Sequence, residues 1–262
     1  MDAGRKTDKP FEILFHGGGK MYENLLGEFL GTFILVVFGC GVVANVILKK
    51  TKGENSGWIV ITVGWGIAVC CGVFFAEATG SVQADINPAV TFAKIFMGIY
   101  TVPHALLTMA VQFAGAFFGA FIIYLFYYPH WKETPDTATK LGVFCTAPAI
   151  RSLGNALFCE ITGTVILITV ILSIFKELSG QIANSYGPYL VGFLVWGIGV
   201  SLGGTTGYAI NPARDLGPRI AHAVLPIPGK GSSDWGYAWV PVAGPLIGGA
   251  IAFVLGKIFG LV

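Results

Sequence analysis

Long runs of apolar residues dominate the chain, and short polar segments separate them. Six of these runs are long enough to cross a bilayer as helices, because about 20 apolar residues match the thickness of its hydrocarbon core. The six runs are Leu25–Leu48, Gly57–Ala78, Val102–Tyr128, Leu153–Phe175, Gly187–Ile210 and Tyr237–Leu261. Segments rich in proline and polar residues, such as 129–148 and 226–235, are expected to be connecting loops. The pattern predicts an all-α membrane protein with six transmembrane helices.

Two shorter apolar stretches interrupt this pattern, and each follows a copy of the tripeptide Asn-Pro-Ala. The copies are Asn87-Pro88-Ala89 and Asn211-Pro212-Ala213, and the stretches are Val90–Ile99 and Leu216–Leu225. Asparagine is a good helix N-cap, and proline suits the first helical position because an N–H there has no helical partner. About ten helical residues span about 15 Å, half the hydrocarbon thickness. We therefore expect two half-membrane helices whose N-termini face each other near the midplane.

The two halves of the chain repeat each other. Glu28 in the first run and Glu160 in the fourth both open a Glu-x-x-Gly-Thr motif, and each motif precedes a second run, an Asn-Pro-Ala box and a third run. Because three crossings reverse the direction of the chain, an inverted 3+3 repeat is expected, at about 22–128 and about 150–262 of a single domain 22–262. Residues 1–21 are expected to be a polar tail.

A carboxylate within a transmembrane run is costly and needs partners. Glu28 and Glu160 are expected either to bond a neighbouring helix or, as we favour, to accept hydrogen bonds from the irregular loop before each half-helix. These loops, Gly80–Ile86 and Gly203–Ile210, are tolerated at membrane depth only where they line a cavity. Their carbonyl groups and the two box asparagines would then offer acceptors and donors to a polar solute.

Composition supports a membrane protein. Hydrophobic residues make up 54% of the 262 residues and charged residues 11%, less than half the charged fraction of about 25% in soluble domains. A net charge of +2 gives no argument for a nucleic-acid partner. The five cysteines and four histidines have no metal-ligand spacing, and no nucleophile–base pair is evident, so neither a metal, a cofactor nor an enzyme active site is expected. Lysine and arginine are balanced between the two sides, so charge does not settle orientation.

Two Asn-Pro-Ala boxes in register with paired glutamate motifs and six runs resemble the major intrinsic proteins, the aquaporins and glycerol facilitators. The resemblance implies a six-helix bundle in the cell membrane with both termini, and hence the tail, in the cytoplasm. It also implies a homotetramer with one pore in each subunit. Asp215, Arg219 and Pro241 are similar to the signature of the glycerol-facilitator branch.

The resemblance places a four-residue selectivity filter at Trp65, Gly199, Tyr208 and Arg214. The two aromatic rings would face solute carbon, and the guanidinium would donate to hydroxyl groups. Water-selective members have a histidine where Gly199 stands, so that wall is expected to be open, with room beside the Tyr208 ring. The implied function is a passive channel for glycerol and small neutral polyols, and for water, that excludes protons and ions. A water-selective aquaporin and a secondary transporter with a half-helix substrate site remain alternatives.

One position departs from the family pattern. The family that the chain resembles usually has Ser-Gly-x-His before the first box, and this chain has Val82-Gln83-Ala84-Asp85. Asp85 takes the place of the histidine at the expected inner mouth. A carboxylate there is expected either to pair with a cation or to be neutralised by burial, and in the second case it would modulate permeability with pH.

Overall fold

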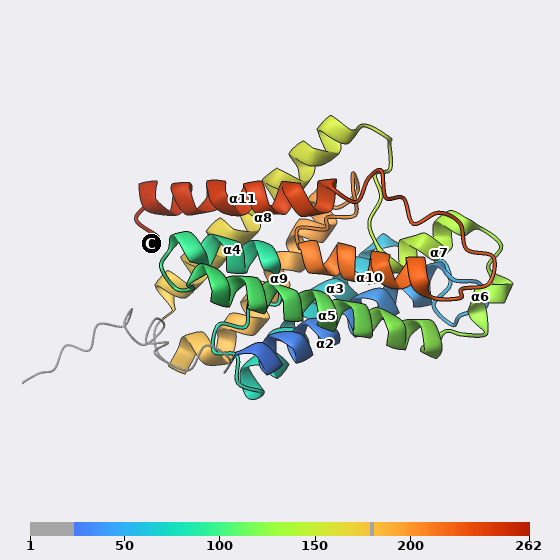
Figure 1. Ribbon diagram of the computed structural model, residues 1–262, viewed down its shortest axis with the longest axis horizontal. Helices are drawn as coiled ribbons and strands as arrows, with labels where there is room; N and C mark the ends of the chain where they lie inside the picture. The colour runs from blue at the N-terminus through green and yellow to red at the C-terminus, as the bar shows by residue number, and fades with distance from the viewer. Residues whose placement is uncertain (1–23, 179–180) are drawn as a thin grey trace, which may run out of the picture.

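The computed structural model describes residues 24–178 and 181–262, so the expected tail at 1–21 lies outside the described residues. Within these ranges all regular secondary structure is helical. In chain order the helices are α2 (Leu25–Ile47), α3 (Trp58–Ala78), α4 (Pro88–Phe96), α5 (Val102–Phe126), α6 (His130–Glu133), α7 (Thr137–Phe144), α8 (Leu153–Glu177), α9 (Gln181–Leu202), α10 (Pro212–Val224) and α11 (Val240–Ile258). Six of them contain a stretch long and apolar enough to cross a bilayer, as the sequence predicts (Figure 1).

The predicted boundaries are wrong in two places. The fifth span was expected at Gly187–Ile210, but α9 begins earlier, in a polar segment that the apolar pattern excludes, and ends at Leu202. Two glycines follow Leu202, and their low helix propensity favours the end of the helix there. The connection at 129–148 contains α6 and α7 instead of being only a loop. Asp136 caps α7, because its carboxylate accepts a hydrogen bond from the N–H of Thr139 at 2.7 Å.

The two halves of the chain pack in the same order. α2 packs against α3 and α5 in the first half, α8 packs against α9 and α11 in the second, and α3 and α9 join the halves. At that junction Gly66 and Gly192 face each other: a Cβ at either one would lie 2.8 or 2.7 Å from the carbonyl oxygen of the other. Small residues let transmembrane backbones approach closely. The helix order and these contacts are those of the predicted inverted repeat.

α4 and α10 are the two half-membrane helices, and each begins at the proline of its Asn-Pro-Ala box, ahead of the predicted apolar stretch. Asn87 and Asn211 cap them by accepting hydrogen bonds from the N–H of Ala89 at 2.9 Å and of Ala213 at 3.0 Å. Figure 1 shows both helices in the middle of the bundle. Each one packs on the other repeat, α4 on α11 and α10 on α5, so the half-helices lock the two halves together.

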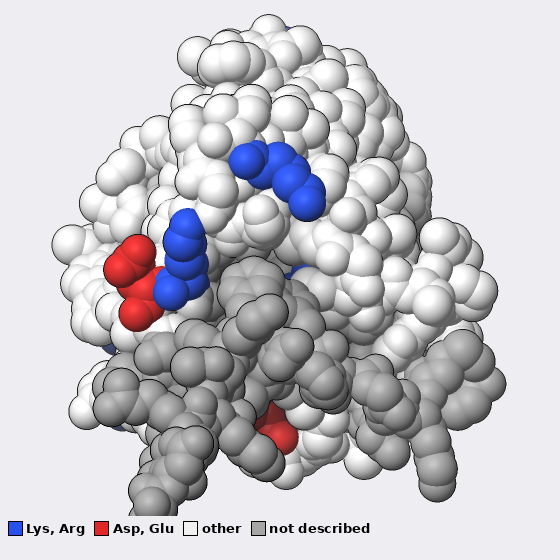
Figure 2. All heavy atoms as spheres, turned by 90° about the vertical axis from the view of Figure 1, so that its left-hand side faces the viewer, with Lys and Arg blue, Asp and Glu red and all other residues white. Residues whose placement is uncertain are grey.

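The surface of the bundle is largely apolar. Large apolar side chains are exposed on several of the long helices, and examples are Ile67, Phe118, Ile166, Phe193 and Val254. Figure 2 shows the end of the molecule at which the C-terminus lies, where the described surface carries only scattered Lys, Arg, Asp and Glu side chains. An apolar outer surface is what contact with lipid requires, so the polar groups that matter for function are to be sought inside the bundle.

Candidate functional site

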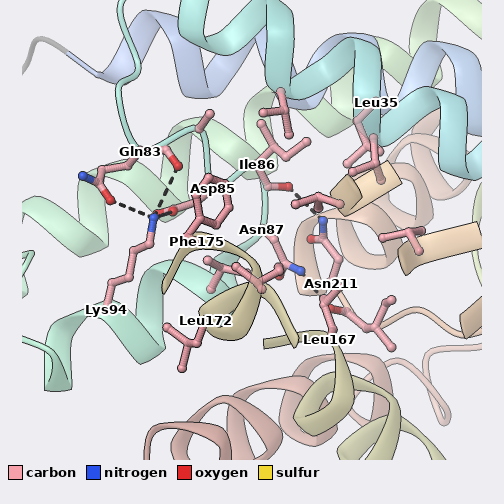
Figure 3. Close-up of a pocket in the computed structure, with 18 of the residues that line it drawn as sticks. Leu35, Gln83, Asp85, Ile86, Asn87, Lys94, Leu167, Leu172, Phe175 and Asn211 are labelled. Carbon is pink, nitrogen blue, oxygen red and sulfur yellow. Dashed lines mark hydrogen bonds and ion pairs between the residues drawn. The ribbon is translucent and has the colours of Figure 1, made fainter. Parts of the chain in front are cut away.

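The two Asn-Pro-Ala boxes meet at the centre of the bundle. The side-chain nitrogen of Asn87 donates a hydrogen bond to the carbonyl oxygen of Ile210, and that of Asn211 donates to Ile86, both at 2.8 Å (Figure 3). Each asparagine therefore holds the residue that precedes the other one. An amide nitrogen carries two hydrogens, so one donor of each asparagine remains. Both side chains line a central cavity, so the second donor is available to a solute in that cavity.

The loops before the boxes have matching, strained backbones. Ala84 and Ile86 in the first loop have φ angles of 40° and 43°, and Tyr208 and Ile210 in the second have 39° and 43°. Residues other than glycine rarely adopt this left-handed region, and each such residue costs about 1–3 kcal/mol. The contacts around the loops must therefore impose this conformation.

The paired glutamates supply these contacts. Both side chains are fully buried. Glu28 accepts hydrogen bonds from the backbone N–H groups of Asp85 and Ile86, both at 2.8 Å. In the second repeat Glu160 accepts from the two residues before the second box, at 3.0 and 2.8 Å. A hydroxyl group of each loop also donates to its glutamate, at 2.6 and 2.7 Å. Each carboxylate thus satisfies backbone donors that have no helical partner.

The rest of the Glu-x-x-Gly-Thr motif serves the same loops. A Cβ at Gly31 would lie 2.8 Å from the side chain of Ile86, and one at Gly163 would lie 2.9 Å from that of Ile210. Glycine at these positions makes room for the residue before each box. The motif threonines donate to the carbonyl oxygens of their own glutamates, at 2.7 and 2.8 Å, which satisfies their hydroxyl groups inside the bundle. The spacing of the motif therefore follows from the shape of the loop.

Both loops line a cavity of about 170 Å³ (Figure 3). Its wall combines two kinds of surface. Loop backbone and the two asparagine side chains supply hydrogen-bonding groups, while Leu35, Val69, Leu167 and Val195 supply apolar surface. In the described ranges, no group of three or more His, Cys, Asp or Glu residues is placed to hold a metal ion. This chemistry suits a small polar molecule that exchanges hydrogen bonds with the wall.

Three of the four predicted filter residues, Trp65, Tyr208 and Arg214, line the cavity together. The guanidinium carbon of Arg214 lies 3.9 Å from the centre of the Trp65 ring, a cation–π contact. One guanidinium nitrogen donates to the carbonyl oxygen of Phe144 at 3.5 Å. Arg214 forms no ion pair with any carboxylate in the described part of the chain, so most of its donors remain for a solute.

The fourth predicted filter residue, Gly199, lies behind the Tyr208 ring. A Cβ at Gly199 would lie 2.7 Å from Cζ of Tyr208. The expectation of an open wall with room beside the ring is therefore corrected: the ring itself occupies the space that the missing side chain leaves. Gly199 acts on the cavity through Tyr208.

Asp85 pairs with a cation, the first of the two states expected for it. The ammonium group of Lys94 on α4 forms an ion pair with Asp85 and also donates to the side-chain and backbone oxygens of Gln83, at 2.8 and 3.3 Å (Figure 3). The second carboxylate oxygen accepts from the hydroxyl of Thr91 at 2.8 Å. These bonds tie the first loop to the half-helix that it precedes.

The branch-signature residues Asp215 and Arg219 form a fully buried ion pair on α10, at 2.9 Å. Asp215 also accepts from the N–H and hydroxyl of Thr146, both at 2.7 Å, and Arg219 donates to the carbonyl oxygen of Ser233 at 2.8 Å. These contacts hold the loops that lead into α8 and α11. Pro241 is buried in the first turn of α11. The signature therefore supports the position of α10 from outside the cavity.

Three residues make contacts near the cavity that were not predicted from the sequence. Gln112 on α5 donates to Glu28 at 2.7 Å. Gly39 on α2 leaves the space that the Trp65 indole occupies, because a Cβ there would overlap the ring. Trp58 donates to the backbone of Gly199 at 3.2 Å. A glutamine, a glycine and a tryptophan inside or at the end of apolar runs carry no signal of such contacts in the sequence.

The fold and the cavity define a multi-pass membrane protein whose inverted repeats meet around a central cavity. Residues 18–255 match the family model described as Major intrinsic protein, and the chain belongs to this family. It is similar to a protein of Thermotoga maritima named "Probable glycerol uptake facilitator protein", with 55% identity over 86% of this chain and 94% of that protein.

Two further comparisons agree with this placement. The glycerol uptake facilitator protein of Bacillus subtilis is 52% identical over 87% of this chain and 81% of that protein. The X-ray structure of the aquaglyceroporin from Plasmodium falciparum superimposes with a TM-score of 0.79 and 29% identity, covering 91% of this chain and 96% of that one. The fold predicted from the sequence, six transmembrane helices and two half-helices in an inverted repeat, is confirmed.

Proposed function

We propose that the protein is a passive channel for glycerol and similar small uncharged polyols. The observation that carries this proposal is the part of the cavity wall where Trp65 and Tyr208 offer aromatic carbon and Arg214 offers guanidinium donors. Glycerol has carbon along one edge and hydroxyl groups along the other, which matches such a wall. The names of the two similar proteins, both glycerol uptake facilitators, support the same substrate.

A polyol that leaves water must regain hydrogen bonds in the pathway, each with a net contribution of about 1 kcal/mol. The loop backbones and the asparagine amides supply partners along the cavity. The CH groups of the polyol meanwhile bury apolar surface against the rings, at roughly 25 cal/mol per Å². Neither contribution requires an ion gradient, so transport follows the solute gradient alone.

Water is expected to pass as well, while protons and ions are expected to be excluded. The N-termini of α4 and α10 meet at the asparagines, and each contributes the equivalent of about half a positive charge. A water molecule there would accept from both amides and turn its hydrogens away, which interrupts a proton wire. An inorganic cation would meet this potential and Arg214, with too few acceptors to replace its hydration shell.

We further propose that the channel is a homotetramer in the cell membrane, with both termini in the cytoplasm. The support is the resemblance to the major intrinsic proteins, since the balance of lysine and arginine favours neither orientation. Native mass spectrometry of the purified protein should give a mass four times that of the 27.7 kDa chain. Protease access to a terminal tag in right-side-out vesicles tests the orientation.

Flux measurements separate the channel from its alternatives. Purified protein in liposomes is exposed to water, glycerol and urea gradients in a stopped-flow instrument, without an ion gradient. We expect glycerol flux that rises in proportion to the gradient and water flux above that of empty liposomes. Saturation, or a need for an ion gradient, would favour a secondary transporter. A transporter needs an ionisable residue that couples the two fluxes, and the candidate for it, Asp85, is already paired with Lys94. Water flux without glycerol flux would favour the water-selective alternative.

Lys94→Met is expected to destabilise the protein more than Lys94→Met combined with Asp85→Asn. The single change leaves a buried carboxylate without its cation, which costs about 3 kcal/mol, whereas the double change removes both charges. The measurement is the midpoint of thermal unfolding in detergent, followed by glycerol flux in liposomes. Lys176→Met is the matched control, because this lysine also lines the cavity but, among the described residues, bonds only the carbonyl of Gly260. Equal loss in the single and double variants would contradict the role of the pair.

Gly39→Ala is expected to reduce glycerol flux about 100-fold, because the added methyl group displaces the Trp65 indole in the cavity wall and a displacement of about 1 Å has effects of this size. Gly41→Ala on the same helix is the control, since within the described part of the chain a Cβ there would meet only Ile123, at 3.3 Å. Both variants are compared with the wild type in liposomes at equal protein content. Wild-type flux in Gly39→Ala would mean that the ring can shift without narrowing the pathway.

A further inference from the structure

The ring of Tyr208 is held by packing alone. Its hydroxyl is buried and has no hydrogen-bond partner among the described residues. Two glycines form a slot behind the ring: a Cβ at Gly199 would lie 2.7 Å from Cζ, and one at Gly203 would overlap the ring. With no hydrogen bond to fix the side chain, the groups that bound this slot determine how far the ring reaches toward Trp65 and Arg214.

Trp58, the first residue of α3, also bounds the slot, because a Cβ at Gly203 would lie 2.9 Å from its Cζ2. Its ring meets that of Tyr208 edge to face, with centroids 5.9 Å apart and planes at 82°. Its indole N–H donates to the carbonyl oxygen of Gly199 at 3.2 Å, and the same oxygen accepts from the N–H of Gly203 at 3.2 Å. Trp58 is therefore attached to the turn of backbone that carries both slot glycines.

Membrane anchoring does not account for these contacts. Tryptophan is common at the ends of transmembrane helices, where the ring lies at the bilayer interface. Trp58 is 42% exposed and fits that description in part. An anchor, however, needs neither a hydrogen bond to a distant helix nor a ring contact with a residue of the cavity wall. Trp58 has both, and both concern the same side chain, Tyr208.

We propose that Trp58 is a positioning residue for the filter and sets the size limit for polyols by fixing the Tyr208 ring. The inference rests on the proposed function as a polyol channel. Trp58 does not line the cavity and does not touch the solute; it acts through Tyr208. Without the indole, the Tyr208 ring gains room to lean away from Trp65 and Arg214, and the pathway widens.

The test is the ratio of erythritol to glycerol permeability in liposomes, because erythritol is one CHOH unit longer. Trp58→Ala is expected to raise this ratio about tenfold, the lower range of discrimination for one such unit in a shaped pocket. Trp58→Phe keeps an edge-to-face ring and is expected to retain the ratio within about twofold. If Trp58→Ala folds poorly, Trp58→Leu takes its place, because leucine keeps apolar bulk at this exposed position. Trp58→Leu should likewise raise the ratio of erythritol to glycerol permeability.

Two controls isolate the role of the ring. Trp239→Ala removes a tryptophan of similar exposure, 46%, that does not line the cavity, and it should leave the ratio unchanged. In a Tyr208→Leu background Trp58→Ala should add no further change, because its effect passes through the Tyr208 ring. An unchanged ratio in Trp58→Ala, or an equal fall for all solutes, would overturn the proposal. A wild type that passes no glycerol would refute the proposed function instead, so the two failures are distinct.

Discussion

Gly199→His is expected to block glycerol and most of the water flux, and not to produce a water-selective pore. Any Cβ at this position lies 2.7 Å from Cζ of Tyr208, closer than side-chain carbons approach. The ring is therefore pushed toward Trp65 and Arg214, into the pathway. The sequence alone predicts that the histidine suppresses glycerol flux more than water flux. The contact with Tyr208 changes this prediction, because the displaced ring obstructs both solutes.

Adding Tyr208→Ala to Gly199→His should separate the two solutes. Removal of the ring gives the imidazole space to line the pathway, so water flux should recover. Glycerol flux should stay about 100-fold below the wild type, because groups displaced by about 1 Å from their binding positions have effects of this size. Gly197→Ala is the matched control on the same helix, because a Cβ there has no atom of the described residues within 4 Å. A Gly199→His protein that keeps wild-type fluxes of both glycerol and water would show that the filter has been misplaced.

Glu28→Ala is expected to destabilise the protein by several kcal/mol and to abolish flux. The carboxylate accepts from the hydroxyl of Ser81 at 2.6 Å, the N–H groups of Asp85 and Ile86 at 2.8 Å, and the amide of Gln112 at 2.7 Å. Each buried donor left without a partner costs about 1–3 kcal/mol. Two of these donors hold the left-handed loop before the first box, so their release also frees the cavity wall.

Glu28→Gln should be milder, since one acceptor oxygen remains and the volume is preserved. The readouts are the midpoint of thermal unfolding in detergent and glycerol flux in liposomes. Glu160→Ala is expected to match Glu28→Ala, because it stands at the same position of the second repeat. Glu177→Ala, at an exposed glutamate at the end of α8, should change neither quantity. Equal damage from the alanine and glutamine changes would argue against the acceptor role.

The sequence by itself determines the framework of this protein, because the framework follows from local constraints. Hydrocarbon thickness sets the length of the apolar runs, so six transmembrane helices are predicted from hydropathy. An asparagine N-cap followed by proline starts a helix wherever it occurs, so α4 and α10 begin at Pro88 and Pro212. A carboxylate in the membrane needs donors, and the nearest unsatisfied donors are in the loop of the same repeat.

Features of the protein that depend on non-local contacts cannot be predicted in this way. The short helices α6 and α7 depend on packing and capping, which the apolar pattern does not record: Trp131 of α6 is buried, and Asp136 caps α7. The sequence left two states open for Asp85, and only the folded chain brings the ammonium group of Lys94 to it. The choice depends on the rotation of α4 about its axis, which no residue spacing specifies.

Only the tertiary structure decided which side chains shape the part of the cavity that we propose as the filter. Trp65 and Arg214 can be assigned from a resemblance, but their 3.9 Å contact depends on how α3 and α10 are placed relative to each other. In the sequence Gly39 is one helix glycine among many, and Trp58 is a tryptophan at the end of an apolar run. Close-packed helices leave space for a ring only where the facing residue is small, which gives Gly39 its role beside Trp65. A ring is held in place only where another side chain contacts it, which gives Trp58 its role beside Tyr208.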